Sequence, residues 1–200
     1  MSAIITTANR AQDLLDKFSA IDFIAPLVFR IYLAPIFILA GINKLSSVEN
    51  VAWWFASLGI PAPTLMVYVA GLSELIGGIC ILIGLATRWF AVPLMFTMVV
   101  AAVTAHWDNG WHVLPETELT VPWEWKTDLI EEASTRKSKV ISILKEHGNY
   151  DWLTEAGPVT ILKNGIEFAA TYFIILLSLF FTGAGKYLSL DYWIARNFRS

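Results

Sequence analysis

The 200-residue chain has little charge and almost no cysteine. Charged residues make up 16% of it, against about 25% in an average soluble domain. The single cysteine, Cys80, excludes an intramolecular disulfide and a two-cysteine redox motif. The net charge of −3 gives no electrostatic support for binding nucleic acid. The composition is therefore not that of a soluble globular domain, a disulfide-stabilised secreted protein or a nucleic-acid-binding protein.

Apolar residues are abundant and are gathered in long stretches. They make up 56% of the chain, and the mean hydropathy is +0.58. Three charged residues interrupt the four longest apolar stretches: Arg30, Glu74 and Glu167. Because a helix needs about 20 residues to cross about 30 Å of hydrocarbon, each stretch is long enough to approach a membrane span. We predict an all-α fold, a four-helix transmembrane bundle in one membrane domain over 1–200, with spans at about 23–45, 63–85, 88–106 and 164–183.

The segment between the third and fourth predicted spans, residues 107–163, is too long for a simple connector. Residues 127–147 have the apolar spacing of one helix, with acidic residues early, basic residues late and Gly148 after its end. We interpret 107–163 as a small external helical cap that contacts a partner protein. Its tryptophans are typical of interaction surfaces and also of membrane interfaces: Trp107, Trp111, Trp123, Trp125 and Trp152.

Four spans place both termini on the same side of the membrane. The short segments on that side carry most of the basic residues that weigh in the positive-inside rule. We therefore expect both termini in the cytoplasm and residues 107–163 outside. Glycines at 41, 71, 77, 78 and 84 favour close packing of the first two spans.

Two charges inside predicted spans form the first candidate site. Arg30 lies about 10 Å deep and Glu74 about 16 Å deep at 1.5 Å per residue, so a long arginine side chain can bridge the difference. Intramembrane charges usually face a partner or a cavity. One interpretation is an Arg30–Glu74 pair that lines a polar pocket with Tyr32. The alternatives are a purely structural ion pair and an Arg30 side chain that extends to the membrane surface.

The outer ends of the spans form the second candidate site. A histidine beside a carboxylate can relay protons near neutral pH, and His106 has Glu167 and Asp108 as candidate partners. The alternative is an interfacial network that ties the cap to the bundle. The spacing of His106, Asp108 and His112 matches no strong zinc or copper signature, so we predict no metal site. The polar residues expected at this depth are Asn43, Lys44, His106, Asp108, Asn164 and Glu167.

Several of these features together resemble one family. The runs RIYLAPIFILAGINKL and WWFASLGIPAPTLMVYVAGLSELIGGICILIGLATRW are similar to the DoxX family of small bacterial membrane proteins. The run AHWDNGWHVL and the long insertion resemble its HvfX-like branch. The resemblance implies a four-helix membrane protein of the bacterial inner membrane. Family members include a subunit of a thiosulfate:quinone oxidoreductase and a membrane partner of redox-defence proteins. It implies no secure role for the motif residues Arg30, Gly41, Lys44, Glu74 and Arg88.

We expect the protein to be a quinone-linked redox subunit or accessory, although whether it is itself catalytic stays open. The candidate catalytic residues are Arg30, Glu74, His106 and Glu167. The candidate quinone pocket comprises Arg30, Tyr32, Asn43, Lys44 and Glu74. The expected contacts are the lipid bilayer, a protein partner through 107–163 and, because four helices offer few pockets, a second copy of the chain. Two alternatives are a non-enzymatic membrane anchor or assembly factor, and a small transporter or metal-handling protein.

Overall fold

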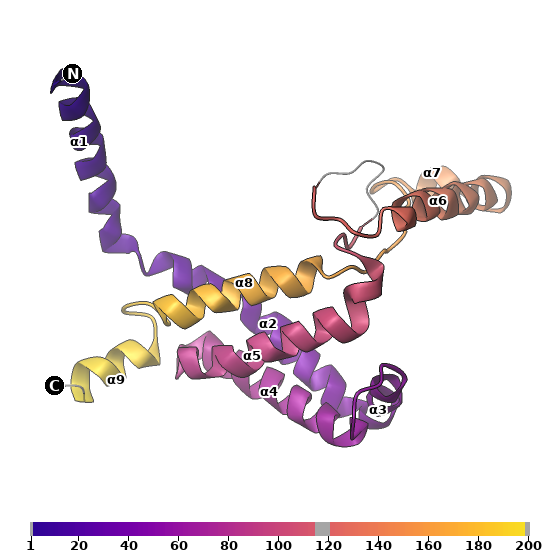
Figure 1. The fold of residues 1–200 in the computed structure, drawn as a ribbon, viewed down its shortest axis with the longest axis horizontal. Helices are drawn as coiled ribbons and strands as arrows, with labels where there is room; N and C mark the ends of the chain where they lie inside the picture. Colours follow the sequence, from indigo (N-terminus) through magenta and orange to yellow (C-terminus); the bar gives the residue numbers. More distant parts are fainter. Residues whose placement is uncertain (1, 115–120, 199–200) are drawn as a thin grey trace. The chain divides into compact units, whose positions relative to one another are not determined.

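The computed structural model describes residues 2–114 and 121–198, and no strand occurs among them. This confirms the all-α class. Figure 1 shows the helices in chain order. They are α1 (Ser2–Lys17), a 3-10 turn (Phe18–Ile21), α2 (Ile24–Ser46), α3 (Val48–Ser57), α4 (Pro63–Ile83), α5 (Thr87–Ala101), a π-helical turn (Ala102–His106), a 3-10 turn (Trp107–Asn109), α6 (Asp128–His147), α7 (Tyr150–Leu153), α8 (Glu167–Thr182) and α9 (Leu190–Phe198).

Three helical stretches of the described residues are long and apolar enough to cross a membrane. They are Ile24–Ser46, Pro63–Ile83 and Thr87–Asn109. The fourth predicted span corresponds to α8, which is apolar but has only 16 residues. At 1.5 Å per residue it is about 24 Å long, shorter than the hydrocarbon layer. The chain is therefore a membrane protein, and the number of its crossings stays a prediction.

The chain divides into two compact units. The first, which we call the membrane-helix unit, comprises Met1–Ser57, Pro61–Met95 and Ile174–Ser200. The second, the insertion unit, comprises Leu58–Ile60 and Phe96–Phe173. The insertion unit includes 107–163, whose placement as an external cap stays a prediction.

In the membrane-helix unit, α2 and α4 pack closely because glycines remove side chains from their interface. A Cβ added to Gly41 would lie 2.6 Å from the backbone nitrogen of Leu75 and 2.7 Å from the oxygen of Gly71. A Cβ added to Gly78 would lie 3.0 Å from the backbone nitrogen of Ile38. These contacts confirm the predicted close packing, and they fix the register in which the two helices meet. The fully buried core around them includes Leu33, Ala34, Val67, Ile81 and Leu94.

The long helix of the insertion unit is α6, which confirms the helix predicted over 127–147. Asp128 and Glu131 lie in its first turn, and Lys145 and His147 lie in its last turn. These charges complement the helix dipole. The helix ends at His147, and the backbone N–H of Gly148 donates to the oxygen of Leu144. The position of α6 could therefore be predicted from the local sequence alone.

Candidate functional site

Arg30 is a buried clamp between the end of α4 and the C-terminal segment. Its side chain is 2% exposed. Nε donates to the oxygen of Ile81 at 2.8 Å, and Nη2 donates to that of Leu82 at 2.7 Å. Nη1 donates to Ala184 at 2.8 Å, and both terminal nitrogens donate to Leu188 at 3.1 Å. All five N–H groups of the guanidinium therefore donate to backbone oxygens. Some of these oxygens belong to the last turn of a helix, where carbonyls have no partner within the helix.

The predicted Arg30–Glu74 pair is wrong. Because α2 and α4 are antiparallel and Gly41 lies against Leu75, Glu74 is level with the second half of α2. Arg30 lies eleven residues before Gly41, or about 16 Å along the helix. The sequence argument measured both depths from the helix ends, but α2 and α4 are staggered by their glycine contacts. Glu74 instead pairs with Lys44 in the last turn of α2.

The Lys44–Glu74 pair is the charged group that the membrane helices bring together. Lys44 Nζ donates to Glu74 Oε2 at 2.6 Å, and the two side chains are 21% and 5% exposed. Gly71 lies beside the lysine, since a Cβ there would be 3.4 Å from Lys44 Cβ. Among the residues that the structure describes, Lys44 is the only hydrogen-bond partner of Glu74. One carboxylate oxygen and two ammonium hydrogens thus remain available to a ligand.

The other predicted pocket residues are not gathered around this pair. The Tyr32 side chain is 51% exposed, and Asn43 is also exposed, so both face outward from α2. Arg30 is committed to backbone oxygens. Of the five residues predicted to bind quinone, the structure therefore brings only Lys44 and Glu74 into contact. That Lys44 and Glu74 bind quinone stays a prediction.

In the insertion unit, His106 lies at the end of the π-helical turn Ala102–His106. Its Nδ1 is 2.9 Å from the backbone oxygen of Asn164, which also accepts from Asn109 Nδ2 at 3.2 Å. Because a carbonyl oxygen only accepts, this hydrogen bond requires Nδ1 to carry a proton. No hydrogen bond or ion pair links Glu167 to this ring; its Oε2 accepts from the backbone N–H of Val113 at 3.0 Å. The expected pairing of His106 with a carboxylate is not formed.

The most buried ion pair among the described residues, Lys163–Glu124, was not predicted from the sequence. Lys163 Nζ donates to Glu124 Oε2 at 2.7 Å, and the side chains are 3% and 0% exposed. The carboxylate also accepts from the backbone amides of Trp111, His112 and Lys126. Burial by itself would raise the pKa of Glu124, but the hydrogen bonds from Lys163 and these amides lower it to about 2. This pair closes the segment between α5 and α6.

Two glycines make room for that closure, and they were its only sequence signal. Gly110 has a φ of +78°, and a Cβ there would collide with Glu124 Oε1. A Cβ on Gly165 would lie 2.5 Å from three backbone oxygens of residues 110–112. The closed segment holds two tryptophan pairs, with ring centroids 4.9 and 5.7 Å apart: Trp107–Trp125 and Trp111–Trp123. Among the described residues, no group of three or more His, Cys, Asp and Glu side chains could hold a metal ion.

Residues 25–107 match the model of one family, described as DoxX. The chain is 36% identical over 81 residues to a Bacillus subtilis protein named "Putative oxidoreductase CatD", which covers 40% of this chain and 59% of that protein. It is 36% identical over 84 residues to the inner membrane protein YphA of Escherichia coli, covering 41% and 60%. It is 35% identical over 78 residues to the uncharacterised membrane protein Rv3486 of Mycobacterium tuberculosis, covering 38% and 48%.

These matches span about half of the length of the relatives, and no solved structure matches the chain. The family match at residues 25–107 includes both Lys44 and Glu74. Most of the insertion unit and all of α8 and α9 lie outside the matched residues. The resemblance of the insertion to the HvfX-like branch therefore stays a prediction.

Proposed function

Because residues 25–107 match the DoxX family model, we propose that this chain is a DoxX-family membrane protein that serves as a quinone-linked redox subunit or accessory of a bacterial inner membrane. The name of CatD supports a redox role, and YphA is named as an inner membrane protein. The two electrons come from a partner protein that docks on 107–163. The basic residues of the short segments support cytoplasmic termini.

The observation that carries this proposal is the unsaturated Lys44–Glu74 pair inside apolar helices. A bound quinone takes up two electrons and two protons and becomes a quinol. The chemistry of the pair fits that need, because Lys44 can donate a hydrogen bond to a ring oxygen. Glu74 Oε1, which has no hydrogen-bond partner within the described residues, can accept from a hydroxyl group. Lys44 is 21% exposed, so a ligand can approach the pair from that side.

Two residues of the insertion unit have supporting parts in this proposal. His106 donates a hydrogen bond from Nδ1 to the backbone oxygen of Asn164, which orients the ring, and Nε2 is the atom that we propose exchanges a proton. Glu167 binds the amide of Val113 and is therefore a positioning residue. Arg30 is likewise a positioning residue, because it orders the ends of α4 and the C-terminal segment.

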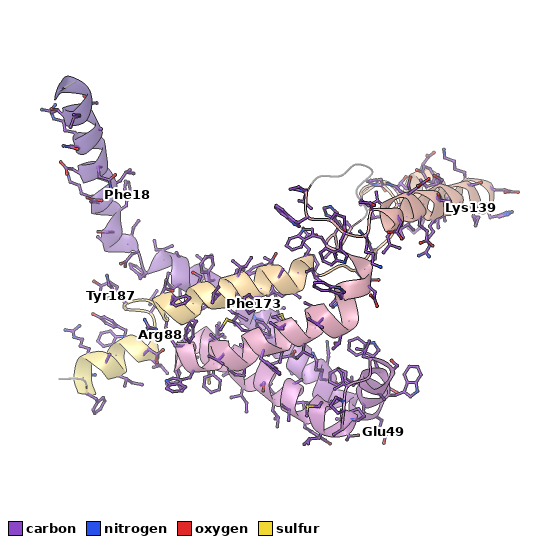
Figure 2. The ribbon with its side chains drawn as sticks, viewed as in Figure 1. Phe18, Glu49, Arg88, Lys139, Phe173 and Tyr187 are labelled. Carbon is purple, nitrogen blue, oxygen red and sulfur yellow. The ribbon has the colours of Figure 1, made fainter. Side chains whose placement is uncertain are left out.

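The experiment is mass spectrometry of small molecules that co-purify with the protein in mild detergent. We expect wild type to retain quinone and Glu74→Gln to retain at least about tenfold less, because it loses a charge-assisted contact. Glu49→Gln is the matched control, since Glu49 is exposed on α3 (Figure 2) and its loss leaves the pair intact. Equal quinone in wild type and Glu74→Gln would contradict the proposed site.

A non-enzymatic membrane anchor is the second candidate function. The observation that favours it is the pair of tryptophan contacts held by Lys163–Glu124, in which Trp123 is 56% and Trp125 is 37% exposed. Aromatic side chains held rigidly at a surface are typical anchors for a partner. If wild type retains no quinone, this function is favoured. We would then expect a partner protein to co-purify with wild type and with Glu74→Gln, and to be lost when Trp123 and Trp125 are replaced by alanine.

A further inference from the structure

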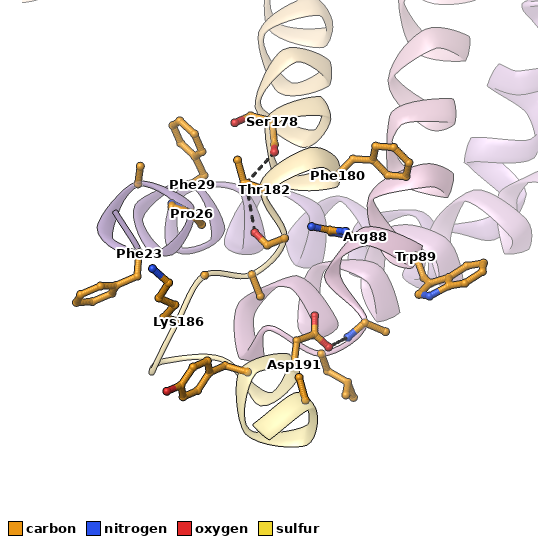
Figure 3. A pocket seen from close by; sticks show the side chains of 18 of the residues that line it. Phe23, Pro26, Phe29, Arg88, Trp89, Ser178, Phe180, Thr182, Lys186 and Asp191 are labelled. Atoms are coloured by element: carbon orange, nitrogen blue, oxygen red, sulfur yellow. Dashed lines mark hydrogen bonds between the residues drawn. The ribbon is translucent and has the colours of Figure 1, made fainter. Parts of the chain in front are cut away.

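A cleft of about 1130 Å³ opens in the membrane-helix unit, away from the Lys44–Glu74 pair. It lies where the start of α2, the start of α5 and the end of α8 meet the C-terminal segment. Figure 3 shows it from close by. The wall combines aromatic and aliphatic side chains with two cations, including Phe29, Arg88, Val92, Lys186 and Tyr192. A site with this mixture fits a ligand that is apolar at one end and charged at the other.

Both carboxylates of the cleft are already engaged. Asp191 accepts from the backbone N–H groups of Ala86 at 2.6 Å and Thr87 at 3.0 Å, which caps the start of α5. Asp22 pairs with Lys186 at 3.0 Å, and both side chains are 52% exposed. The hydrogen bond and charge of Asp22 raise the pKa of Lys186, so this lysine is cationic at neutral pH. Neither carboxylate is therefore available to pair with the other cation of the cleft.

That remaining cation is Arg88. Its Nη2 donates to the backbone oxygen of Phe181 at 3.0 Å, and no carboxylate of the described residues lies within 4.0 Å of it. Figure 3 shows the guanidinium pointing toward the segment that follows α8. Four of its N–H groups have no partner among the described residues. Such a planar fork matches the oxygens of a phosphate group.

The position of Arg88 in the chain indicates that the phosphate belongs to a lipid headgroup. Arg88 and Trp89 lie in the first turn of the candidate span Thr87–Asn109, at the level where the helix enters the membrane. Trp89 is 81% exposed, and indole rings are favoured at the headgroup layer. The headgroup layer supplies phosphates that are covalently attached to acyl chains. The apolar wall beside Arg88, formed by Phe29 and Val92, can hold the first part of such a chain.

We propose that this cleft binds the phosphate of an anionic phospholipid, with Arg88 as the fork on its oxygens and Lys186 as the second cation. The acyl chains lie along the apolar wall at the start of α2 and α5. The lipid fills the space between α2, α5 and the C-terminal segment. This inference is independent of the proposed quinone site, because it uses none of the same residues.

The test is native mass spectrometry of the detergent-purified full chain titrated with dioleoylphosphatidylglycerol. We expect Arg88→Gln to weaken binding at least about tenfold. Arg136→Gln is the matched control, because it removes the same charge from an exposed arginine. Arg136 lies on α6 and pairs with Glu132. Val92→Trp should also weaken binding, since it fills the apolar wall without changing any charge. Thermal unfolding in detergent shows whether each variant is folded.

Two further arms separate a lipid from other ligands. Dioleoylphosphatidylcholine, whose headgroup has no net charge, should bind at least about tenfold more weakly. Inorganic phosphate, added in excess over the lipid before exchange into volatile buffer, should not displace the phosphatidylglycerol, because it lacks the acyl chains. Equal binding of phosphatidylglycerol by wild type and a folded Arg88→Gln would overturn the proposal. So would displacement by inorganic phosphate, or a quinone that occupies the cleft and is lost in Arg88→Gln.

Discussion

Two lysine–glutamate pairs of nearly equal length have different surroundings in the two units. Lys44–Glu74 and Lys163–Glu124 have nitrogen–oxygen distances of 2.6 and 2.7 Å. The Glu124 side chain is fully buried and also accepts hydrogen bonds from three backbone amides. Among the described residues, Glu74 accepts a hydrogen bond from Lys44 alone. A carboxylate with every acceptor site in use holds structure together. One with a free oxygen and a partly exposed partner can serve a ligand.

Breaking the saturated pair should have the largest effect. Lys163→Met leaves the Glu124 carboxylate buried without its counter-ion, which costs about 3–5 kcal/mol. Hydrogen exchange of residues 107–114 and 121–126 should therefore become much faster than in wild type. Arg136→Gln breaks the exposed Arg136–Glu132 pair and should cost at most about 1 kcal/mol. Equal exchange in the two variants would mean that Lys163–Glu124 does not hold the segment closed.

Arg30 extends the comparison to a buried cation that forms no ion pair within 4.0 Å among the described residues. Arg30→Lys keeps the charge but loses the fork, so several backbone oxygens of α4 and the C-terminal segment lose their donor. We expect a loss of about 2–3 kcal/mol in the stability of the detergent-solubilised protein. The expected sign is faster hydrogen exchange at residues 184–192. Unchanged exchange there would show that Arg30 does not order the C-terminal segment.

The pH dependence of stability tests the contribution of Glu124. The pKa of Glu124 is about 2 in the folded protein and 4.5 in its ordinary state, so its stabilisation is complete above about pH 5. It is lost as the pH falls toward 2, and the loss is about 2 kcal/mol by pH 3. Tryptophan fluorescence of the insertion unit at pH 7, 5 and 3 measures this. Glu124→Gln should be less stable at pH 7 and should lose this dependence; a wild-type response in that variant would assign the transition to another group.

The unsaturated pair should contribute least to stability. Glu74→Gln removes one charge-assisted contact at a partly exposed partner, so we expect a loss of about 1 kcal/mol. Thermal unfolding of Glu74→Gln and Glu124→Gln in the same detergent gives the comparison directly. If Glu74→Gln is the more destabilising of the two, the pair in the membrane helices is structural, and the quinone site proposed there loses its basis.

Local sequence was sufficient for much of the fold and for little of the candidate site. The span ending at Ile83, α6 with its terminal charges, and the close packing at Gly41 and Gly78 follow from composition, spacing and residue size. The site did not follow, because each partner depends on the register between helices. Because α2 and α4 are staggered, Glu74 pairs with Lys44 and not with Arg30.

The sequence by itself determined that this is an all-helical membrane protein with few charges inside its apolar helices, because hydrophobic length and helix signals act over neighbouring residues. Only the tertiary structure decided which polar atom each buried charge meets. Lys163 and Glu124 are 39 residues apart, and the cleft joins Asp22 to Lys186 across most of the chain. The physical reason is that a buried charge must be paired, while its pairing is chosen by whichever donors and acceptors packing brings within reach.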